Sequence, residues 1–585
     1  MNSNTIDIES VNISQEVKLT PFKRLFRMLS LDKKEIFVIY AYAIFNGLIN
    51  LSLPLGVQAI IGFVISAEFS SSWGLLIFIV VMGVAASGII QILQLSLTEL
   101  LQRRIFTRSA FEFAYRIPRF KMEAILTTYA PELMNRFFDT LNIQKGLSKI
   151  LIDTSTSILQ ILFGLILLSF YHSFFVFFGI ALVGLITLIF FLTGPRGLKT
   201  SIMESKYKYQ VAHWLEELAR VMGTFKLAGE TNLPIEKMNH YVANYLKFRK
   251  QHFNILIIQF SNIVAFKTIV TGGLLILGSV LVINQEINLG QFVASEIIIL
   301  LVLNSSEKLI LSMETIYDVL TGLEKLGQVT DIETESEDGI NLSEITKGKG
   351  ISLELTGLTY KYPGNQKPTV DDVHLKVGIG EKVCITGINQ SGKSTLLSLV
   401  SGLYHNYEGS IHFNGIPLGD INIMSFRSVI GDNLGLQDLF FGTLQENISV
   451  GKKGIEIEDI LWAINQVGLD DFFKQLPKGL STEIQPEGQG LSTSIKQKII
   501  LARTLAEKPK LIVIDNTLHG MDYEDRKHVS NILMDPKAEW TLVAVTSDPL
   551  MLSACDKVVT MEYGKIVDVE TNKKKTQRTK KDTNA

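Results

Sequence analysis

A glycine-rich segment with one lysine and three hydroxyl side chains has the clearest chemical pattern in the sequence. It reads Gly387-Ile-Asn389-Gln390-Ser391-Gly392-Lys393-Ser394-Thr395 and follows a short strand-like run that begins at Lys382. This G-x-x-x-x-G-K-[ST] spacing lets backbone N–H groups surround phosphates where a strand turns into a helix. The lysine adds positive charge, and Ser394 offers its hydroxyl to Mg²⁺. The pattern predicts a P-loop that binds ATP with Mg²⁺.

A second run of apolar residues ends in a carboxylate. Leu511-Ile-Val-Ile-Asp515 predicts a strand that brings Asp515 to the Mg²⁺ side of the phosphates. The next residue is Asn516, whose amide can hydrogen-bond a water but cannot accept its proton. After the next predicted strand, 541–546, come Ser547 and Asp548. Asp548 is an alternative base on the sole ground of its position.

The elements that position these residues fill only the second half of the 585-residue chain. Hydrophobic residues make up 47% and charged residues 19%, and the apolar ones concentrate in the first half, which predicts a membrane domain followed by a soluble one. A net charge of -2 gives no overall attraction to nucleic acid. Two cysteines, Cys384 and Cys555, do not suggest a structural disulfide in a cytosolic domain.

Six stretches of the first half are long and apolar enough to cross a bilayer of roughly 30 Å. They are Ile36–Ile65, Trp73–Leu97, Ser155–Tyr171, Phe174–Thr193, Asn254–Ile283 and Leu289–Leu311. Of the ionisable residues inside them, Lys267 is expected to reach back to the interface, while Glu296 lies closer to mid-membrane and suits a polar cavity.

The distribution of basic residues predicts the orientation. The short loops 66–72, 171–173 and 284–288 have no Lys or Arg, whereas the long connections 98–154 and 194–253 are rich in both. Both termini and the ATP-binding domain are therefore expected in the cytosol, and the long connections should extend the membrane helices there. Before the first span, Leu19–Leu31 mixes aromatic and basic residues as an interfacial helix does.

Six spans, a P-loop and the segment Leu491-Ser492-Thr493-Ser494-Ile495-Lys-Gln together resemble ABC transporters over nearly the whole sequence. Leu289-Gly-Gln-Phe and Leu323-Glu-Lys-Leu-Gly resemble half-transporter exporters of type I secretion and of bacteriocin or haemolysin export. The resemblance implies that adenine stacks on Tyr362, for which Tyr360 competes, and that Ser492 meets the ATP of a partner chain. It also implies a dimer, either homodimer or heterodimer.

Several positions depart from the family pattern. Thr493, Ser494 and Ile495 replace the glycines and glutamine of the L-S-G-G-Q signature, Asn516 replaces the catalytic glutamate, and Ser547 replaces the switch histidine. Gly435 stands at the loop glutamine, with Gln437 two residues away. No catalytic position is therefore predicted intact, which leaves ATP hydrolysis open.

We expect a six-span α-helical transmembrane domain followed by an α/β nucleotide-binding domain. Its parts are a loose N-terminus (1–18), the transmembrane domain (19–330), an acidic linker (331–350), the ATP-binding domain (351–568) and a basic disordered tail (569–585). The expected function is an exporter subunit of the bacterial inner membrane for a peptide or protein, with a periplasmic adaptor and an outer-membrane channel as further partners. The alternative is a pseudo-ATPase that binds ATP and acts through a partner.

Overall fold

The computed structural model describes residues 19–65, 71–126, 128–346, 350–435 and 438–571. The expected loose N-terminus, Gln437 and nearly all of the basic tail lie outside these residues. The chain divides into two compact units, one formed by Met1–Arg119 with Thr127–Ile332 and the other by Phe120–Leu126 with Glu333–Ala585. We refer to them as the helical unit and the mixed unit.

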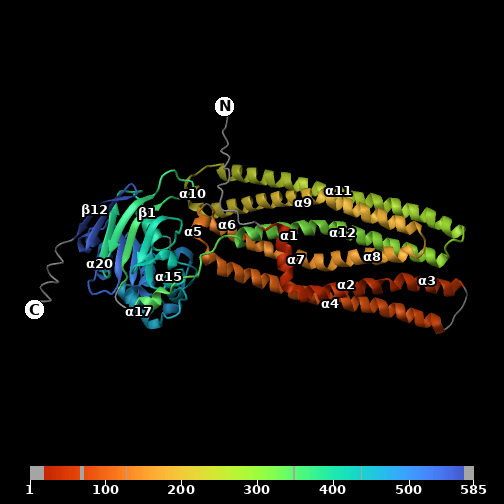
Figure 1. The fold of residues 1–585 in the computed structure, drawn as a ribbon, viewed down its shortest axis with the longest axis horizontal. Helices are drawn as coiled ribbons and strands as arrows, with labels where there is room; N and C mark the ends of the chain where they lie inside the picture. Colours follow the sequence, from red (N-terminus) through yellow and green to blue (C-terminus); the bar gives the residue numbers. More distant parts are fainter. Residues whose placement is uncertain (1–18, 66–70, 127, 347–349, 436–437, 572–585) are drawn as a thin grey trace, which may run out of the picture. The chain divides into compact units, whose positions relative to one another are not determined.

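Among the described residues of the helical unit, six helical stretches are long and apolar enough to cross a membrane, which confirms the predicted number. Its helices, drawn in Figure 1, are α1 (Pro21–Leu29), α2 (Lys33–Asn50), α3 (Ser52–Ile65), α4 (Ser71–Arg116), α6 (Ala130–Met134), α7 (Asp139–Lys149), α8 (Ser155–Ser169), α9 (Phe174–Arg220), α10 (Met222–Leu227), α11 (Leu233–Ile283) and α12 (Leu289–Thr330). Helices α4, α9, α11 and α12 continue well beyond their apolar stretches, as the periodicity of the long connections predicts.

Local sequence explains where two of these helices break or begin. Pro54 has no N–H to donate to the carbonyl of Asn50, and the first span divides there into α2 and α3. At α12, the side chain of Asn288 accepts from the N–H of Gln291, whose own side chain accepts from the N–H of Asn288. This capping box fixes the start of the last span.

Polar side chains tie the long helices together in the helical unit. Gln259 of α11 donates to Thr193 of α9 (2.6 Å) and to Tyr317 of α12 (3.0 Å). Thr200 of α9 is hydrogen-bonded to His252 of α11 (3.1 Å). Because an apolar surrounding strengthens such bonds, they hold α9, α11 and α12 in one register.

Lys267 has a partner that the sequence did not reveal. Its ammonium lies 3.0 Å from Glu307 and 3.0 Å from the amide oxygen of Asn304, so α11 and α12 share an ion pair. The expected position of Lys267 near the membrane interface stays a prediction. One carboxylate oxygen of Glu296 is buried without a hydrogen-bond partner among the described residues.

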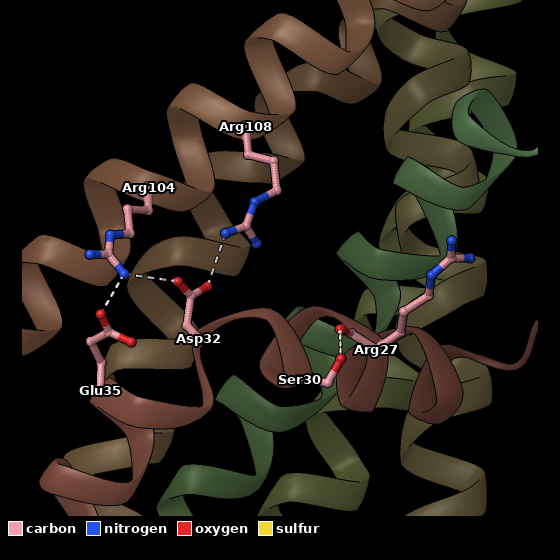
Figure 2. Close-up of polar contacts among 6 residues, drawn as sticks. All are labelled: Arg27, Ser30, Asp32, Glu35, Arg104 and Arg108. Atoms are coloured by element: carbon pink, nitrogen blue, oxygen red, sulfur yellow. Dashed lines mark hydrogen bonds and ion pairs between the residues drawn. The ribbon is translucent and has the colours of Figure 1, made fainter.

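The first helix, α1, is amphipathic, and a buried carboxylate follows it (Figure 2). Phe22 and Phe26 are 52% and 68% exposed, as suits a helix at an interface. Asp32 follows α1 and lies 3.2 Å from Arg104 and 3.1 Å from Arg108 of α4, and Arg104 also pairs with Glu35 (2.6 Å). Asp32 therefore anchors the start of α2 to α4.

The mixed unit is built on a six-stranded sheet of order β12-β11-β3-β10-β9-β6, with a four-stranded sheet β2-β1-β4-β5 and the pair β7-β8. The strands are β1 (Leu353–Tyr360), β2 (Val370–Val377), β3 (Lys382–Gly387), β4 (Glu408–Phe413), β5 (Ile416–Pro417), β6 (Ile430–Asn433), β7 (Gly442–Thr443), β8 (Glu483–Ile484), β9 (Leu511–Asp515), β10 (Thr541–Val545), β11 (Lys557–Glu562) and β12 (Lys565–Thr571). Its helices are α5 (Met122–Ile125), α13 (Leu342–Ile345), α14 (Lys393–Val400), α15 (Ile423–Arg427), α16 (Leu444–Ser449), α17 (Ile457–Gln466), α18 (Asp470–Gln475), α19 (Thr493–Ala506), α20 (Tyr523–Leu533) and α21 (Pro549–Ala554).

Strands β11, β3, β10, β9 and β6 run parallel, so their carboxyl ends meet at one edge of the sheet. The central strands β9 and β10 are nearly continuous apolar runs, as expected for strands covered on both faces. This α/β architecture confirms the fold predicted for the second half of the chain.

The short segment Phe120–Leu126 and the acidic stretch after Ile332 pack within the mixed unit. Phe120 forms a β-bridge with Thr334, and Lys121 pairs with Glu333 at 2.8 Å. Glu123 accepts hydrogen bonds from the backbone N–H groups of His405 and Asn406. The described part of the acidic stretch is thus fixed by specific contacts, including a two-point ion pair between Glu335 and Arg427 (2.6 and 2.7 Å).

Candidate nucleotide-binding site

The loop between β3 and α14 contains the predicted P-loop. Gly387 (φ 142°) and Gly392 (φ 92°) have positive φ, a conformation that L side chains rarely adopt. A Cβ on Gly387 would overlap the carbonyl oxygen of Met561, and one on Gly392 would overlap that of Thr369. The backbone therefore follows this path only with glycine at both positions, which leaves its N–H groups at the start of α14.

Lys393 is the first residue of α14, and its side chain folds back over the loop. Its ammonium donates to the carbonyls of Gly387 (3.0 Å) and Ile388 (2.6 Å) and to the hydroxyl of Ser391 (3.1 Å). Burial lowers the pKa of this ammonium, while the charge of Asp515 acts to raise it. The ammonium of Lys393 thus places a positive charge where a phosphate would lie against the N-terminus of α14.

The other predicted residues of the loop differ in exposure. Asn389, Gln390 and Ser394 are exposed, whereas Ser391 and Thr395 are buried. Gln390 has a φ of 64°, so the loop turns sharply at this residue. The exposed group includes Ser394, the predicted Mg²⁺ ligand on the first turn of α14.

Asp515 reaches the same edge of the sheet as the P-loop. Val545 of β10 pairs with Ile385 of β3 on one side and with Asp515 of β9 on the other, so a single strand separates them. Strands lie about 4.8 Å apart, which puts the end of β9 about 10 Å from that of β3. The sheet therefore brings the carboxylate to the phosphate side of the loop.

Two oxygen donors are available for Mg²⁺ at this edge, the hydroxyl of Ser394 and the carboxylate of Asp515. Magnesium prefers oxygen ligands, and in nucleotide sites it takes one or two from the protein and the others from phosphates and water. Within the described ranges no three His, Cys, Asp or Glu side chains gather in a metal-binding group. The donor set fits a Mg²⁺ ion that arrives with a nucleotide rather than one held by the protein alone.

The tyrosines near the site have different environments. Tyr360 is buried and stacks on Tyr404, with ring centroids 5.2 Å apart and an angle of 16° between the rings. Tyr362 is only half-buried, packs edge-on against both, and its hydroxyl lies 3.2 Å from that of Thr395. Of the two candidates for stacking on adenine, Tyr362 is the one with an accessible ring beside the P-loop helix.

Asn516 and the residues after β10 do not supply a free carboxylate. The side-chain amide of Asn516 donates to Asp515 (2.9 Å), and its φ of 48° is a left-handed conformation that asparagine tolerates better than most residues. Ser547 is exposed. Asp548 is buried, caps α21 and pairs with Arg526 at 3.1 Å, which makes it a poor alternative base.

The segment resembling the signature forms the start of α19. Ser492 caps this helix by accepting from the N–H of Ile495 (3.3 Å). Ser494 donates to Asp525 of α20 (2.6 Å), and Lys498 lies 2.5 Å from the same carboxylate. Burial alone would raise the pKa of Asp525, but the hydrogen bonds from Lys498 and Ser494 outweigh it and lower that pKa. Ser494, which stands where the family signature has glycine, thus joins α19 to α20.

Some of these contacts had no signal in the sequence. The bond between Tyr362 and Thr395 joins residues 33 positions apart, and the bond from Ser494 to Asp525 joins residues 31 apart. Gly435, aligned with a family glutamine, has a φ of 71°. That conformation gives a local reason for glycine at this position, which an ungapped alignment does not reveal.

Two family models match the chain, one in the helical unit and one in the mixed unit. The family model described as the ABC transporter transmembrane region matches residues 36–306, and the model described as ABC transporter matches residues 370–519. The solved structure of a bacterial Atm1-family ABC exporter with ATP bound covers 95% of this chain and 96% of its own, with a TM-score of 0.78 at 16% identity. At that identity the likeness establishes the fold alone.

One curated relative is YgaD of Bacillus subtilis, whose name describes a multidrug export ATP-binding/permease protein. It is 28% identical to this chain over 293 residues, which are 50% of each chain. An ATP-dependent lipid A-core flippase of Pseudomonas fluorescens is 28% identical over 255 residues, 43% of this chain and 42% of its own. The chain thus spans about half the length of the curated relatives it matches.

Proposed function

Because this chain belongs to the ABC transporter family, with the membrane region and the nucleotide-binding domain of an exporter half-transporter in one polypeptide, we propose that it is an exporter subunit. In this proposal the subunit binds Mg-ATP at its P-loop and works as a dimer. Its membrane helices would move a substrate across the bacterial inner membrane, with both termini and the mixed unit in the cytosol. The arrangement of Lys393 inside the loop 387–395 is the observation that carries the proposal.

The proposed roles follow the geometry of the site. Lys393, the glycine-turned backbone and the first turn of α14 would hold the phosphates. Ser394 and Asp515 would hold the Mg²⁺, which neutralises phosphate charge when bound. Tyr362 would stack on adenine, and Ser492 at the start of α19 would face the ATP of the partner chain.

The proposed substrate is an amphiphile or another apolar small molecule. The two relatives described above are named for multidrug export and for flipping lipid A-core, and neither is named for type I secretion. A peptide or protein cargo, with a periplasmic adaptor and an outer-membrane channel, is the finer reading that the last-span segments favour. Transport by the purified protein without added partners distinguishes the two.

Purified full-length protein in lipid nanodiscs tests the proposal. ATP binding is measured by equilibrium dialysis, and the Lys393→Ala variant is compared with Lys453→Ala, which removes an exposed lysine elsewhere in the mixed unit. Loss of a charge-assisted contact predicts ATP affinity at least about tenfold weaker for Lys393→Ala and unchanged for the control. Equal affinities for all three proteins would exclude the proposed site.

A second candidate is a pseudo-ATPase that binds ATP, turns it over very slowly and acts by regulating or scaffolding a partner. The specific observation in its favour is that Asn516, Ser547 and Asp548 supply no free base beside Asp515. Loss of a general base costs about 10² to 10⁴ in rate. Turnover near zero in the presence of tight ATP binding supports this candidate, and ATP-driven transport by the purified protein removes it.

A further inference from the structure

A groove runs along the surface between α9 and α11 of the helical unit, two helices that lie side by side in Figure 1. It consists of two adjoining cavities of about 390 and 350 Å³ that share Arg196 and Ile255. Each volume lies in the range of about 300–1,000 Å³ typical of ligand sites. The nucleotide site belongs to the other unit, so this groove needs its own explanation.

Charged and hydrogen-bonding side chains gather toward one end of the groove. The first cavity includes Arg196, Lys199, Thr200, Gln251 and Asn254, beside the apolar side chains of Met203 and Phe248. The second is lined mainly by aliphatic side chains, which are Leu185, Leu188, Ile189, Leu192, Ile255 and Ile258, and also by Thr193, Arg196 and Asn262. A ligand that fills both cavities must therefore be an amphiphile with a charged head.

The two ends also match the depth at which a bilayer would place them. Residues 174–193 have no charge, and Arg196 and Lys199 follow directly after them. The basic end thus lies at the membrane boundary and the aliphatic end in the hydrocarbon. At 1.5 Å per residue, Leu185 and Arg196 are about 16 Å apart along α9. One leaflet is half of a hydrocarbon core of roughly 30 Å, or about 15 Å, so the groove is one leaflet deep.

The charged groups of Arg196 and Lys199 are available to a ligand. Both Arg196 and Lys199 are exposed, and within the described residues no ion pair involves either of them. Nearby on the same two helices, Arg249 is instead paired with Glu204 at 3.2 Å. A guanidinium beside an ammonium at a membrane boundary is complementary to a phosphate, which a guanidinium binds through two parallel hydrogen bonds.

Hydrogen bonds between α9 and α11 fix the walls of the groove. The bonds Thr193–Gln259 and Thr200–His252 join α9 to α11 at the two levels of the groove, and both Gln259 and His252 are buried. The groove is thus formed by two fixed helices and needs no rearrangement to receive a lipid.

We propose that the α9–α11 groove binds an anionic phospholipid of the surrounding bilayer. Its phosphate would lie between Arg196 and Lys199, and an acyl chain would run along Leu192, Leu188 and Leu185. This site is independent of the proposed transport activity and of the nucleotide site.

The test uses the full chain in nanodiscs of phosphatidylcholine with a minor share of phosphatidylglycerol carrying a diazirine in one acyl chain. After irradiation, lipid adducts are mapped by mass spectrometry. The variant R196Q/K199Q is compared with K206Q/K250Q, which removes two exposed lysines of the same helices that do not line the groove. Unchanged thermal unfolding in detergent verifies that both variants are folded.

The proposal expects adducts on α9 and α11 in the wild type and the control, and about tenfold fewer in R196Q/K199Q because charged hydrogen bonds are lost. It also expects diazirine phosphatidylcholine to label the groove less than phosphatidylglycerol does. Equal labelling of variant and control overturns it. So does displacement of the lipid by millimolar inorganic phosphate, since this would show a site for a free anion.

A photoreactive benzoylphenylalanine in place of Leu192 reports what covers the groove. A phospholipid adduct supports the proposal. A crosslink to a second copy of the chain in its place overturns the proposal, because the groove would then be part of a subunit interface.

Discussion

Asn516 donates its side-chain amide to the carboxylate of Asp515, 2.9 Å away, so the residue in the position of a general base binds the expected Mg²⁺ ligand. An amide in this position satisfies Asp515 but cannot remove a proton from water. In the proposed nucleotide site, the carboxylate of Asp515 would therefore have a neighbour that cannot act as a base.

Restoring the base is expected to raise ATP turnover. Asn516→Glu together with Ser547→His should increase the ATPase rate by about 10², measured as phosphate release from protein in nanodiscs. The gain should be smaller for Asn516→Glu alone, because Ser547 then still supplies no imidazole; the left-handed φ of 48°, which suits glutamate less well than asparagine, limits both variants. Asn516→Gln is the matched control, since it adds length without a base. A rate that does not differ between Glu and Gln at this position would show that turnover is limited elsewhere.

Tyr362 is expected to act through its ring rather than its hydroxyl. Tyr362→Phe loses only the contact with Thr395 and should leave ATP affinity within about twofold, whereas Tyr362→Leu also loses aromatic stacking and should weaken it about tenfold. Tyr404→Phe, in the same cluster but buried, is the control. Equal loss in the Phe and Leu variants would assign the effect to the hydroxyl.

Removing one partner of the ion pair between Lys267 and Glu307 is expected to lower stability more than removing both partners. Lys267→Met leaves a carboxylate among apolar helices and should lower stability by about 1–3 kcal/mol, less than for a fully buried pair because each side chain is about a third exposed. The double variant Lys267→Met/Glu307→Gln should recover most of that loss. Thermal unfolding in detergent measures all three proteins. A double variant less stable than the single one would mean that the pair itself is strongly favourable.

Asp32 is expected to be a structural anchor. Its side chain is 6% exposed and faces two guanidinium groups, so Asp32→Ala should destabilise the helical unit by about 2–4 kcal/mol. The pair Glu99–Arg103 on the same helix α4 is exposed, and Glu99→Ala should change stability by less than about 0.5 kcal/mol. Resistance to limited proteolysis in detergent compares the two. Similar losses for both variants would contradict the anchor.

The architecture was predictable because its signals are periodic and long. Six long apolar stretches with few internal charges, followed by short strand-like runs that alternate with helices, leave little choice of fold class. The P-loop was predictable for a different reason, since Gly387 and Gly392 occupy backbone conformations that other residues cannot enter. In both cases the information lies within a few consecutive residues.

Side-chain partners far apart in the sequence were not predictable. The helical registers that put Lys267 beside Glu307 depend on how α11 and α12 pack, and depth along each span alone did not reveal it. Likewise, the sequence showed Ser494 only as a replacement for a family glycine, and its hydrogen bond to Asp525 of α20 is evident only in the structure. Tertiary packing decided both pairs, and local pattern contains no trace of it.

The docking of Glu123 on His405 has a consequence for how the chain is made. The two residues are 282 positions apart, so at about 5–20 residues per second the ribosome delivers the donor, His405, roughly 14–56 s after the acceptor, Glu123. Throughout that interval, segment 120–126 is synthesised but lacks the domain to which it belongs. A nascent chain stalled before residue 333 would expose this segment to proteases, and its protection would report the moment at which the second unit folds.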